Sequence, residues 1–435
     1  MTKGITTWKN WSESVHCSDI EYVEPNSLEA LRHVVKECYE KGRNIRVVGS
    51  GHSFTPLVAT NDVFISINRL QGISSIHSDG YADVWAGTTL KALGALLFEK
   101  GYAMKNLGDI NEQTLAGAIS TGTHGTGTQL GNIPSQVRAV TLLTAEGELM
   151  EISPESNAEY LNAVKVSLGM LGIIVKVELK VVPAYKLVSE SYRLTLDKCF
   201  SQLESLKNDN RNMEFYWFPY TKKVQVKTMN RHDENIDEMN KKRAFIKKVL
   251  IENGVFWMMS ETSRLIPRSA GVISKLSAQG VPVGKEYGSS HQLFTTPRLV
   301  KFQEMEYCIP KEMIKAAIRD IEKIIEKRRF NVHFPIECRF VQNDDIWLSP
   351  SYKRDSAYIA VHMYKGMDFQ AYFSAVEEVC QHYHGRPHWG KMHKTNGAYL
   401  AKQYPQLQSF LQLRKKLDPH GMFVNEYLGH LFDIK

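Results

Sequence analysis

The sequence lacks the marks of several large classes of protein. Six cysteines are spread over 435 residues, and no pair has the close spacing of a zinc knuckle or a redox pair. The N-terminus has no apolar segment typical of a signal peptide. The longest apolar run, SLGMLGIIVKV, is far shorter than the ~20 residues needed to cross a bilayer. We therefore predict a cytoplasmic protein with reduced thiols and no transmembrane segment.

Concentrated positive charge is also scarce. The formal net charge is +7, and the one dense basic run, KKRAFIKK, spans residues 241–248. Binding of nucleic acid would need a larger basic cluster and a recognisable module, so no nucleic-acid partner is predicted. A solvated helix face is the ordinary explanation of such a run. The apolar stretch VLIENGVFWMMS follows it, which leaves a weak peripheral contact with a membrane surface as an alternative.

The order of predicted elements indicates a mixed α+β chain. PNSLEALRHVVKECYEKG predicts a helix that Asn26 caps and Gly42 ends, because its apolar residues recur with the helical period. NIRVVGSG predicts a short strand that enters a glycine loop, and VTLLTAEGELMEI predicts a hairpin. The composition changes beyond Pro183, where residues 184–300 are richer in long polar side chains and have few glycine-rich loops. From residue 302 onward the order is strand, helix, strand, strand, helix, which is typical of an antiparallel sheet covered by helices on one face.

Two glycine-rich segments could hold phosphate groups. They are VVGSGHSF and, over residues 108–128, GDINEQTLAGAISTGTHGTGT. Glycine lets backbone N–H groups approach an anion closely, because it has no Cβ. The first loop lacks the third glycine of the Rossmann fingerprint. This absence argues against an NAD-binding domain and leaves open a flavin-type cradle of another kind.

Two further patterns carry charged or imidazole side chains. In the predicted strand HFPIECRFV, Glu337 and Arg339 share one face and apolar residues occupy the other. The pair is either a solvated ion pair or the polar wall of a pocket. GRPHWGKMH is the second pattern, and histidines at positions 382, 384, 388 and 393 make a metal site an alternative there. The segment has no helical i, i+4 histidine pair with a glutamate, so no metal site is predicted.

The glycine-rich segments also support a resemblance to a known family. GSGHSF, NLGDINEQTLAGAISTGTHGTG and SLGMLGIIVKVELKVVPAY resemble, in this order, the flavin-contacting segments of the vanillyl-alcohol-oxidase family. HWGK is similar to the signature of its aldonolactone branch, to which the alditol oxidases are related. The resemblance implies an FAD-binding domain of two α+β subdomains over residues 1–183. It further implies a cap domain over residues 184–414, and a C-terminal segment, residues 415–435, that returns to the FAD domain.

The resemblance assigns residues to the cofactor. His52 would carry FAD covalently through the 8α-methyl group of the flavin. Gly108 would lie over the C4a–N5 edge, where a small residue admits dioxygen and so implies an oxidase. The other flavin contacts implied by the resemblance are Gly49, Ser50, Gly51, Ser53, Asp109, Thr114, Gly117, Thr121, Gly122, Thr123, His124 and Ile174.

The resemblance also implies a reaction, which is hydride transfer from a sugar-derived secondary alcohol to flavin N5, followed by reoxidation by dioxygen to hydrogen peroxide. Arg339 would polarise the reacting hydroxyl, and Glu337 would orient the substrate or accept its proton. Lys391 would balance charge on the reduced flavin, and His362 would lie on the substrate side.

An aldono-1,4-lactone of the gulono-, galactono- or arabinono-type is the favoured substrate, and an alditol such as xylitol is the alternative. Two residues depart from the alditol-oxidase pattern: Glu304 replaces a glutamine, and Tyr364 replaces a threonine. Outside the flavoenzymes, a histidine-rich metalloprotein and a catalytically silent nucleotide-binding scaffold remain as rival hypotheses.

Overall fold

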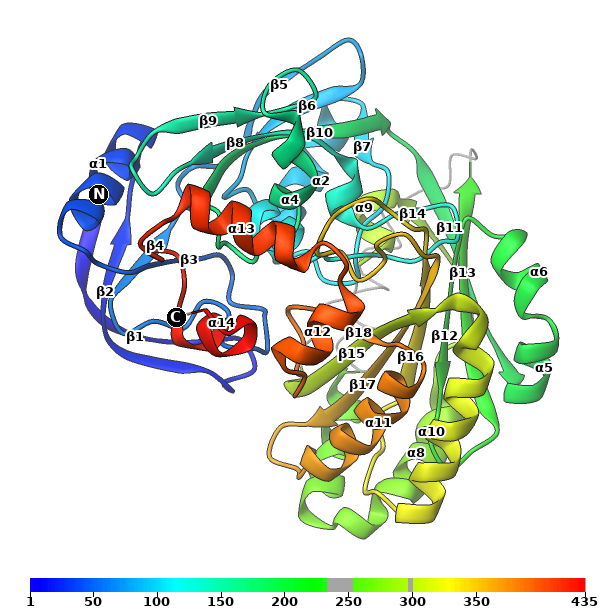
Figure 1. The fold of residues 1–435 in the computed structure, drawn as a ribbon. Helices are drawn as coiled ribbons and strands as arrows, with labels where there is room; N and C mark the ends of the chain where they lie inside the picture. Colours follow the sequence, from blue (N-terminus) through cyan, green and yellow to red (C-terminus); the bar gives the residue numbers. More distant parts are fainter. Residues whose placement is uncertain (233–252, 296–299, 435) are drawn as a thin grey trace.

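The computed structural model describes residues 1–232, 253–295 and 300–434 of the chain. These residues fold around three β-sheets of four, six and eight strands. The two smaller sheets come from the N-terminal part of the chain and lie in one half of the molecule, and the eight-stranded sheet lies in the other (Figure 1).

The first sheet has the strand order β1-β2-β4-β3, and β4 pairs in parallel with both of its neighbours. Helix α1 packs its apolar stripe into the adjoining core. The predicted cap at Asn26 is wrong by one residue: Ser27 has the extended backbone of an N-cap, and its hydroxyl accepts the N–H of Ala30 at 3.1 Å. The elements are β1 (Thr2–Lys9), β2 (His16–Glu24), α1 (Leu28–Glu40), β3 (Ile45–Val48) and β4 (Val63–Ser66).

The second sheet has the order β5-β6-β10-β8-β9, and β7 also pairs with β10. Strands β8 and β9 form the predicted hairpin, and Gly147 takes a positive φ of 78° in its turn. The elements are β5 (Ile73–Ile76), β6 (Tyr81–Trp85), α2 (Leu90–Glu99), β7 (Tyr102–Met104), α3 (Leu115–Ser120), β8 (Val137–Leu143), β9 (Leu149–Ile152), α4 (Leu161–Val164) and β10 (Ile173–Pro183).

The third sheet is antiparallel, with the order β14-β11-β13-β12-β16-β17-β15-β18. Helices α10 and α11 cover one face, as Figure 1 shows, and bury their apolar residues with those of the strands in a second core. The predicted antiparallel sheet with helices on one face is therefore confirmed. The elements are β11 (Lys186–Thr195), α5 (Leu196–Ser201), α6 (Leu203–Asn208), β12 (Asn212–Trp217), β13 (Lys223–His232), α8 (Ala270–Gly280), β14 (Gly284–Ser289), α9 (Ser290–Leu293), β15 (Phe302–Pro310), α10 (Ile314–Arg328), β16 (Ile336–Val341), β17 (Ser356–Tyr364), α11 (Gln370–His382) and β18 (Arg386–Pro387).

The C-terminal helices return to the half of the molecule that holds the two smaller sheets. Residues of α12 (Gly397–Gln403), α13 (Leu407–Leu417) and α14 (Glu426–Phe432) pack in the core of those sheets. The return therefore begins earlier than the predicted residue 415. The predicted boundary at residue 183 falls between the last strand of the second sheet and the first strand of the third.

No helix among the described residues is long and apolar enough to cross a membrane. The basic run at residues 241–248 lies outside the described residues, as does the start of the apolar stretch that follows it. The described part of that stretch belongs to a helix over residues 253–265, on which Val255, Trp257 and Met258 are exposed.

Candidate active site

Two adjoining cavities lie beside the glycine loops, and the first of them extends from these loops to the third sheet. The first has a volume of about 670 Å³ and the second about 920 Å³. His52, Ser53, Gln113 and Thr121 line both of them, so the cavities meet at the first glycine loop. The first cavity opens toward the polar face of the third sheet, and the second runs along the end of β3 and beside α3.

The second cavity is a cradle formed by backbone. Gly49 and Gly51 follow β3, and Gly117 lies in α3. A Cβ on Gly49 would collide with the hydroxyl of Thr114, and one on Gly51 would come within 2.9 Å of the Trp8 ring. Gly51 also has a positive φ of 67°. These positions require glycine, and the close approach of backbone that results suits a phosphate-bearing cofactor.

A buried cation lies on the wall of the second cavity. Arg46 is 3% exposed, and it donates hydrogen bonds to the carbonyls of Leu168 and Gly169, at 2.8 and 3.2 Å, and to that of Phe423. Burial lowers its pKa to about 10, so the guanidinium stays charged at neutral pH. Its Nε has no hydrogen-bond partner among the described residues. Besides the electrostatic influence of Asp418, only neutral carbonyls hold this buried cation, and such a charge favours an anionic occupant.

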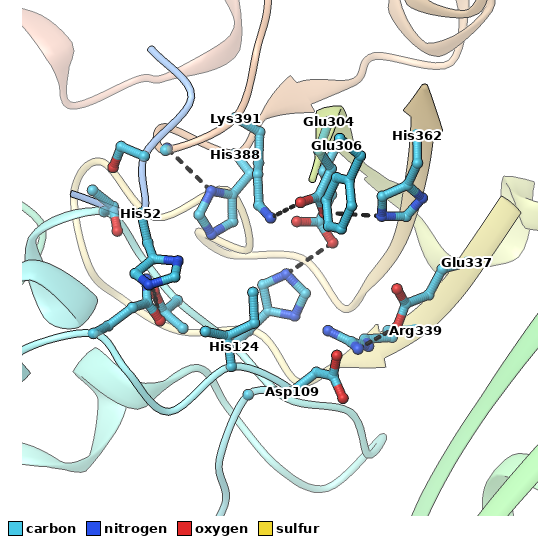
Figure 2. A pocket seen from close by; sticks show the side chains of 18 residues that line it. His52, Asp109, His124, Glu304, Glu306, Glu337, Arg339, His362, His388 and Lys391 are labelled. Carbon is cyan, nitrogen blue, oxygen red and sulfur yellow. Dashed lines mark hydrogen bonds and ion pairs between the residues drawn. The ribbon is translucent and has the colours of Figure 1, made fainter. Parts of the chain in front are cut away.

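The first cavity has one wall of charged side chains from the third sheet. Side chains alternate along a strand, so most apolar residues of β12, β15, β16 and β17 face the helices, and the polar ones, with Phe302, face the cavity. His52 lies on the side of the cavity opposite Glu337 and Arg339, as Figure 2 shows. The cavity therefore separates the glycine loop from the polar strand face.

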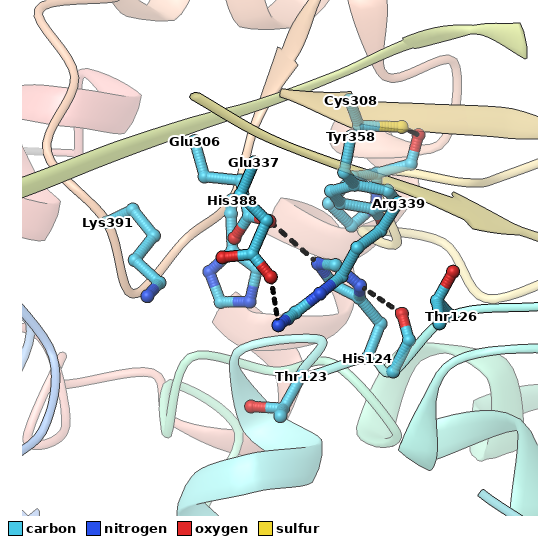
Figure 3. Close-up of polar contacts among 12 residues, drawn as sticks. Thr123, His124, Thr126, Glu306, Cys308, Glu337, Arg339, Tyr358, His388 and Lys391 are labelled. Atoms are coloured by element: carbon cyan, nitrogen blue, oxygen red, sulfur yellow. Dashed lines mark hydrogen bonds and ion pairs between the residues drawn. The ribbon is translucent and has the colours of Figure 1, made fainter. Parts of the chain in front are cut away.

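Arg339 is the centre of this wall. It forms an ion pair with Glu337, shown in Figure 3, and its Nε donates to Glu214 at 2.9 Å. The hydroxyl of Tyr216 lies 3.0 Å from Glu214 and 3.1 Å from Glu337. Burial acts to lower the pKa of Arg339, but the two carboxylates outweigh it and hold the pKa well above its usual range. The side chains of Arg339 and Glu337 are only 11% and 6% exposed, so the pair is a pocket wall and not a solvated surface pair.

A second charged group includes Lys391, which forms an ion pair with Glu304. His362 Nε2 lies 3.4 Å from the other oxygen of the same carboxylate. Burial acts to raise the pKa of Glu304, but the charges of Lys391 and His362 outweigh it and lower the pKa. Glu304 is therefore ionised at neutral pH, and it orients both basic side chains.

His124, Glu306 and His388 form a buried cluster in which three potential metal ligands come together. His124 Nδ1 lies 2.9 Å from the carbonyl of Gly125, and its Nε2 lies 3.2 Å from Glu306. Both partners of the ring are oxygen acceptors, and Figure 3 shows its contact with the carboxylate. His388 Nδ1 accepts the N–H of Gly390 at 3.1 Å, so its Nε2 carries the proton. The contact between His124 and Glu306 accounts for this cluster as a buried polar pair.

His52 is positioned as a neutral imidazole. Burial lowers its pKa, and the charge of Lys391 lowers it further. The indole of Trp11 stacks on the ring, with centroids 5.7 Å apart and an interplanar angle of 22°. An unprotonated ring nitrogen has the lone pair that a nucleophile needs.

Comparisons with known proteins agree with this architecture. The family model described as D-arabinono-1,4-lactone oxidase matches residues 177–431, and the one described as FAD binding domain matches residues 21–153. The chain belongs to the D-arabinono-1,4-lactone oxidase family. It binds FAD through the N-terminal domain.

Two relatives and one solved structure match nearly the whole chain. L-gulono-1,4-lactone dehydrogenase of Mycobacterium tuberculosis (strain ATCC 25618 / H37Rv) is 36% identical over 97% of both chains. L-gulonolactone oxidase of Mus musculus is 32% identical over 99% of both. A solved structure, "Solvent-stable cholesterol oxidase", matches with a TM-score of 0.85 and 16% identity over 99% of this chain and 98% of that one, which shows the fold alone. The predicted family and fold class are thus confirmed.

Most residues predicted for the site lie on the two cavities. The second cavity and the two glycine loops hold the backbone contacts, and the first holds all four predicted catalytic residues. Gly122 lines neither cavity; its φ of 75° after α3 accounts for a glycine there without a cofactor. On the first cavity are Glu337, Arg339, Lys391, His362, His52, Ser53, Gly108, Asp109, Thr121, Thr123 and His124, and on the second are Gly49, Ser50, Gly51, His52, Ser53, Thr114, Gly117, Thr121 and Ile174.

Four residues of the site were not predicted from the sequence, and they differ in whether a local pattern could have revealed them. Glu306 follows Glu304 by two positions on β15, so strand alternation could have placed both on the cavity. Arg46 interrupts the apolar strand β3, and a charge in such a strand is a usable signal. Glu214 and Tyr216 share a face of β12, but their role depends on the pairing of β12 with β16, which no local pattern reveals.

Proposed function

We propose that this protein is an FAD-dependent oxidase that removes a hydride from the secondary alcohol of an aldono-1,4-lactone of the gulono-, galactono- or arabinono-type. The observation that carries the proposal is the buried Glu337–Arg339 pair, which faces His52 across the first cavity. The names of the relatives, L-gulono-1,4-lactone dehydrogenase and L-gulonolactone oxidase, support this class of substrate.

Each charged residue of the wall has a task in this reaction. Bound FAD would supply N5 as the acceptor of the hydride, which brings an electron pair with it. Arg339, held by Glu214 and Glu337, donates a hydrogen bond to the oxygen of the reacting hydroxyl. Glu337 accepts the hydroxyl proton. Lys391 supplies positive charge that favours the reduced cofactor, and His362 contacts the substrate from the same wall.

A lactone suits this site better than an alditol. The hydroxyl beside a lactone carbonyl is more acidic than that of a simple polyol, so it needs less help from a base. Glu304 also places a carboxylate where the alditol-oxidase pattern has a neutral amide. A peroxide-coupled assay of purified holoprotein against both classes tests the choice. We expect a higher kcat/KM for an aldono-1,4-lactone, and a higher value for xylitol would overturn the proposed substrate class.

We further propose that FAD is attached covalently to His52 through its 8α-methyl group. The neutral, buried imidazole at the junction of the two cavities supports this bond. The backbone cradle on one side would hold the phosphates while the ring nitrogen reaches the cofactor on the other.

Gly108 is the proposed entrance for dioxygen, and we expect Gly108→Ala to slow reoxidation by dioxygen on the order of 10-fold. A Cβ at this position would lie 3.0 Å from the carbonyl oxygen of His124 and 3.4 Å from Thr123 Cγ2, so an added methyl group fills the space. Reduction by lactone without oxygen should change little. Stopped-flow spectroscopy of both half-reactions measures the effect. Gly4→Ala, where a Cβ meets nothing within 4 Å, is the matched control, and unchanged reoxidation of Gly108→Ala would disprove the gate.

The protein's place in the cell is proposed to be the cytoplasm, with weak contact at an anionic membrane surface. Within residues 253–283, Arg268 and Lys275 are exposed, as are several large apolar side chains, so this segment carries both the charge and the apolar area that such contact needs. Co-sedimentation with anionic but not neutral vesicles is expected, and no sedimentation with either would remove the proposal. The exposed apolar residues are Val255, Trp257, Met258, Leu265, Ile266, Val272, Leu276 and Val283.

A further inference from the structure

An N-terminal turn fastens the backbone on both sides of His52. The N–H of Trp11 donates to the carbonyl of Gly51 at 2.8 Å, before the histidine. Asn10 donates from Nδ2 to the carbonyl of Ser53 at 2.9 Å, directly after it. The turn between β1 and β2 therefore fixes the backbone from which the His52 side chain extends.

The side chain of Trp11 then fixes the imidazole itself. Its indole is nearly parallel to the His52 ring, at 5.7 Å between centroids and 22° between planes. The indole is itself held edge-on by Phe302, at 5.2 Å and 70°, and by Phe54, at 6.3 Å and 81°. Phe302 lies on β15 and lines the first cavity. The imidazole thus rests against an aromatic group that both halves of the molecule hold in place.

We propose that Trp11 is a positioning residue for attachment of the flavin: it holds the His52 ring in the plane from which a nitrogen reaches the 8α-methyl carbon. The inference rests on the proposed His52–flavin bond. Attachment breaks one imidazole N–H bond and one methyl C–H bond and forms one N–C bond. The two protons and the electron pair released reduce the flavin, and dioxygen reoxidises it to give hydrogen peroxide.

Two consequences separate this role from simple packing. Loss of the stack frees the imidazole to rotate, so attachment slows while the backbone cradle that holds FAD stays intact. The aromatic partner is needed and not the indole N–H, since Trp11 Nε1 makes no hydrogen bond among the described residues that orients His52. Phenylalanine at this position should therefore restore most of the effect. A merely structural role would instead lower total FAD binding and attachment together.

The test follows the fate of flavin in Trp11→Leu, Trp11→Phe and wild-type protein. Each protein is produced under riboflavin depletion so that it starts without flavin, incubated with added FAD, and precipitated with acid at intervals; flavin in the pellet is covalent. We expect about 5-fold slower attachment in Trp11→Leu and a rate near wild type in Trp11→Phe. Total bound flavin and Tm should stay near wild type. Trp85→Leu is the matched control and should attach flavin normally. It removes a half-buried tryptophan of β6 whose ring lies under the ammonium group of Lys176.

Three outcomes would overturn the inference, and they differ from one another. If all wild-type flavin stays in the acid supernatant, the His52 bond is absent and the proposed attachment falls with it. If wild type and Trp11→Leu attach flavin at the same rate, the proposed His52–flavin bond is retained and only the positioning role of Trp11 is rejected. A Trp11→Leu protein that loses total flavin in proportion to covalent flavin would show that Trp11 only supports the fold.

Discussion

Replacing Arg339 by methionine is expected to lower kcat/KM for an aldono-1,4-lactone by about 10²- to 10³-fold. Methionine keeps much of the side-chain volume but removes the donor aimed at the reacting hydroxyl. It also leaves Glu337 and Glu214 without the cation that lies between them, so one of these buried carboxyls takes up a proton. The base and its orienting partner are therefore lost together. The rate of anaerobic flavin reduction by the lactone measures this step without the oxygen reaction.

Stability has to be separated from chemistry in this variant. Removing one partner from a buried ion pair costs about 3–5 kcal/mol of folding free energy, so Tm is measured alongside. Arg319 offers a matched control, because it also lies between two carboxylates, Asp197 and Glu322, but on the helix-covered side of the third sheet. Arg319→Met should leave flavin reduction unchanged. An Arg339→Met enzyme that folds and keeps more than about a tenth of the wild-type rate would contradict the assigned role.

Replacing His52 by alanine is expected to abolish covalent flavin altogether. The cradle around Gly49, Gly51 and Arg46 is untouched by the change, so the variant should still bind FAD reversibly. Acid precipitation should then leave all of its yellow colour in the supernatant, whereas wild-type colour stays with the pellet. His77→Ala, which changes a partly exposed histidine paired with Asp83, is the control and should behave as wild type. Colour retained in the pellet of His52→Ala would place the attachment on another residue.

Local patterns predicted those parts of the site that a single segment determines. Strand alternation put Glu337 and Arg339 on one face of β16, and that face is buried in the cavity. The glycine loops predicted a backbone cradle, because only glycine permits the approach of chains seen around Gly49 and Gly51. Whether the Glu337–Arg339 pair was solvated or buried was left open by pattern alone. The pair is buried because other segments of the chain pack around it, and the local pattern does not contain this information.

Features that join distant segments were not predictable from the sequence. Glu214 lies opposite Arg339 because β12 pairs with β16, and these strands are far apart in the chain. Lys391 meets Glu304 only because the segment after β18 runs beside β15. The contact of Trp11 with His52 depends on the N-terminal turn folding against the first glycine loop. Helix ends are also imprecise from sequence, since Asn26 and Ser27 are both good capping residues and their neighbours decide between them.

In the proposed reaction, a lactone delivers its hydride to FAD beside the Glu337–Arg339 wall. The most direct measurement is anaerobic addition of an aldono-1,4-lactone to purified, flavin-loaded protein while the absorbance of the oxidised flavin is followed. We predict that the absorbance is lost on addition of the lactone, and that it returns with hydrogen peroxide when dioxygen is admitted. A flavin that stays oxidised with gulono-, galactono- and arabinono-1,4-lactones alike would contradict the proposed reaction.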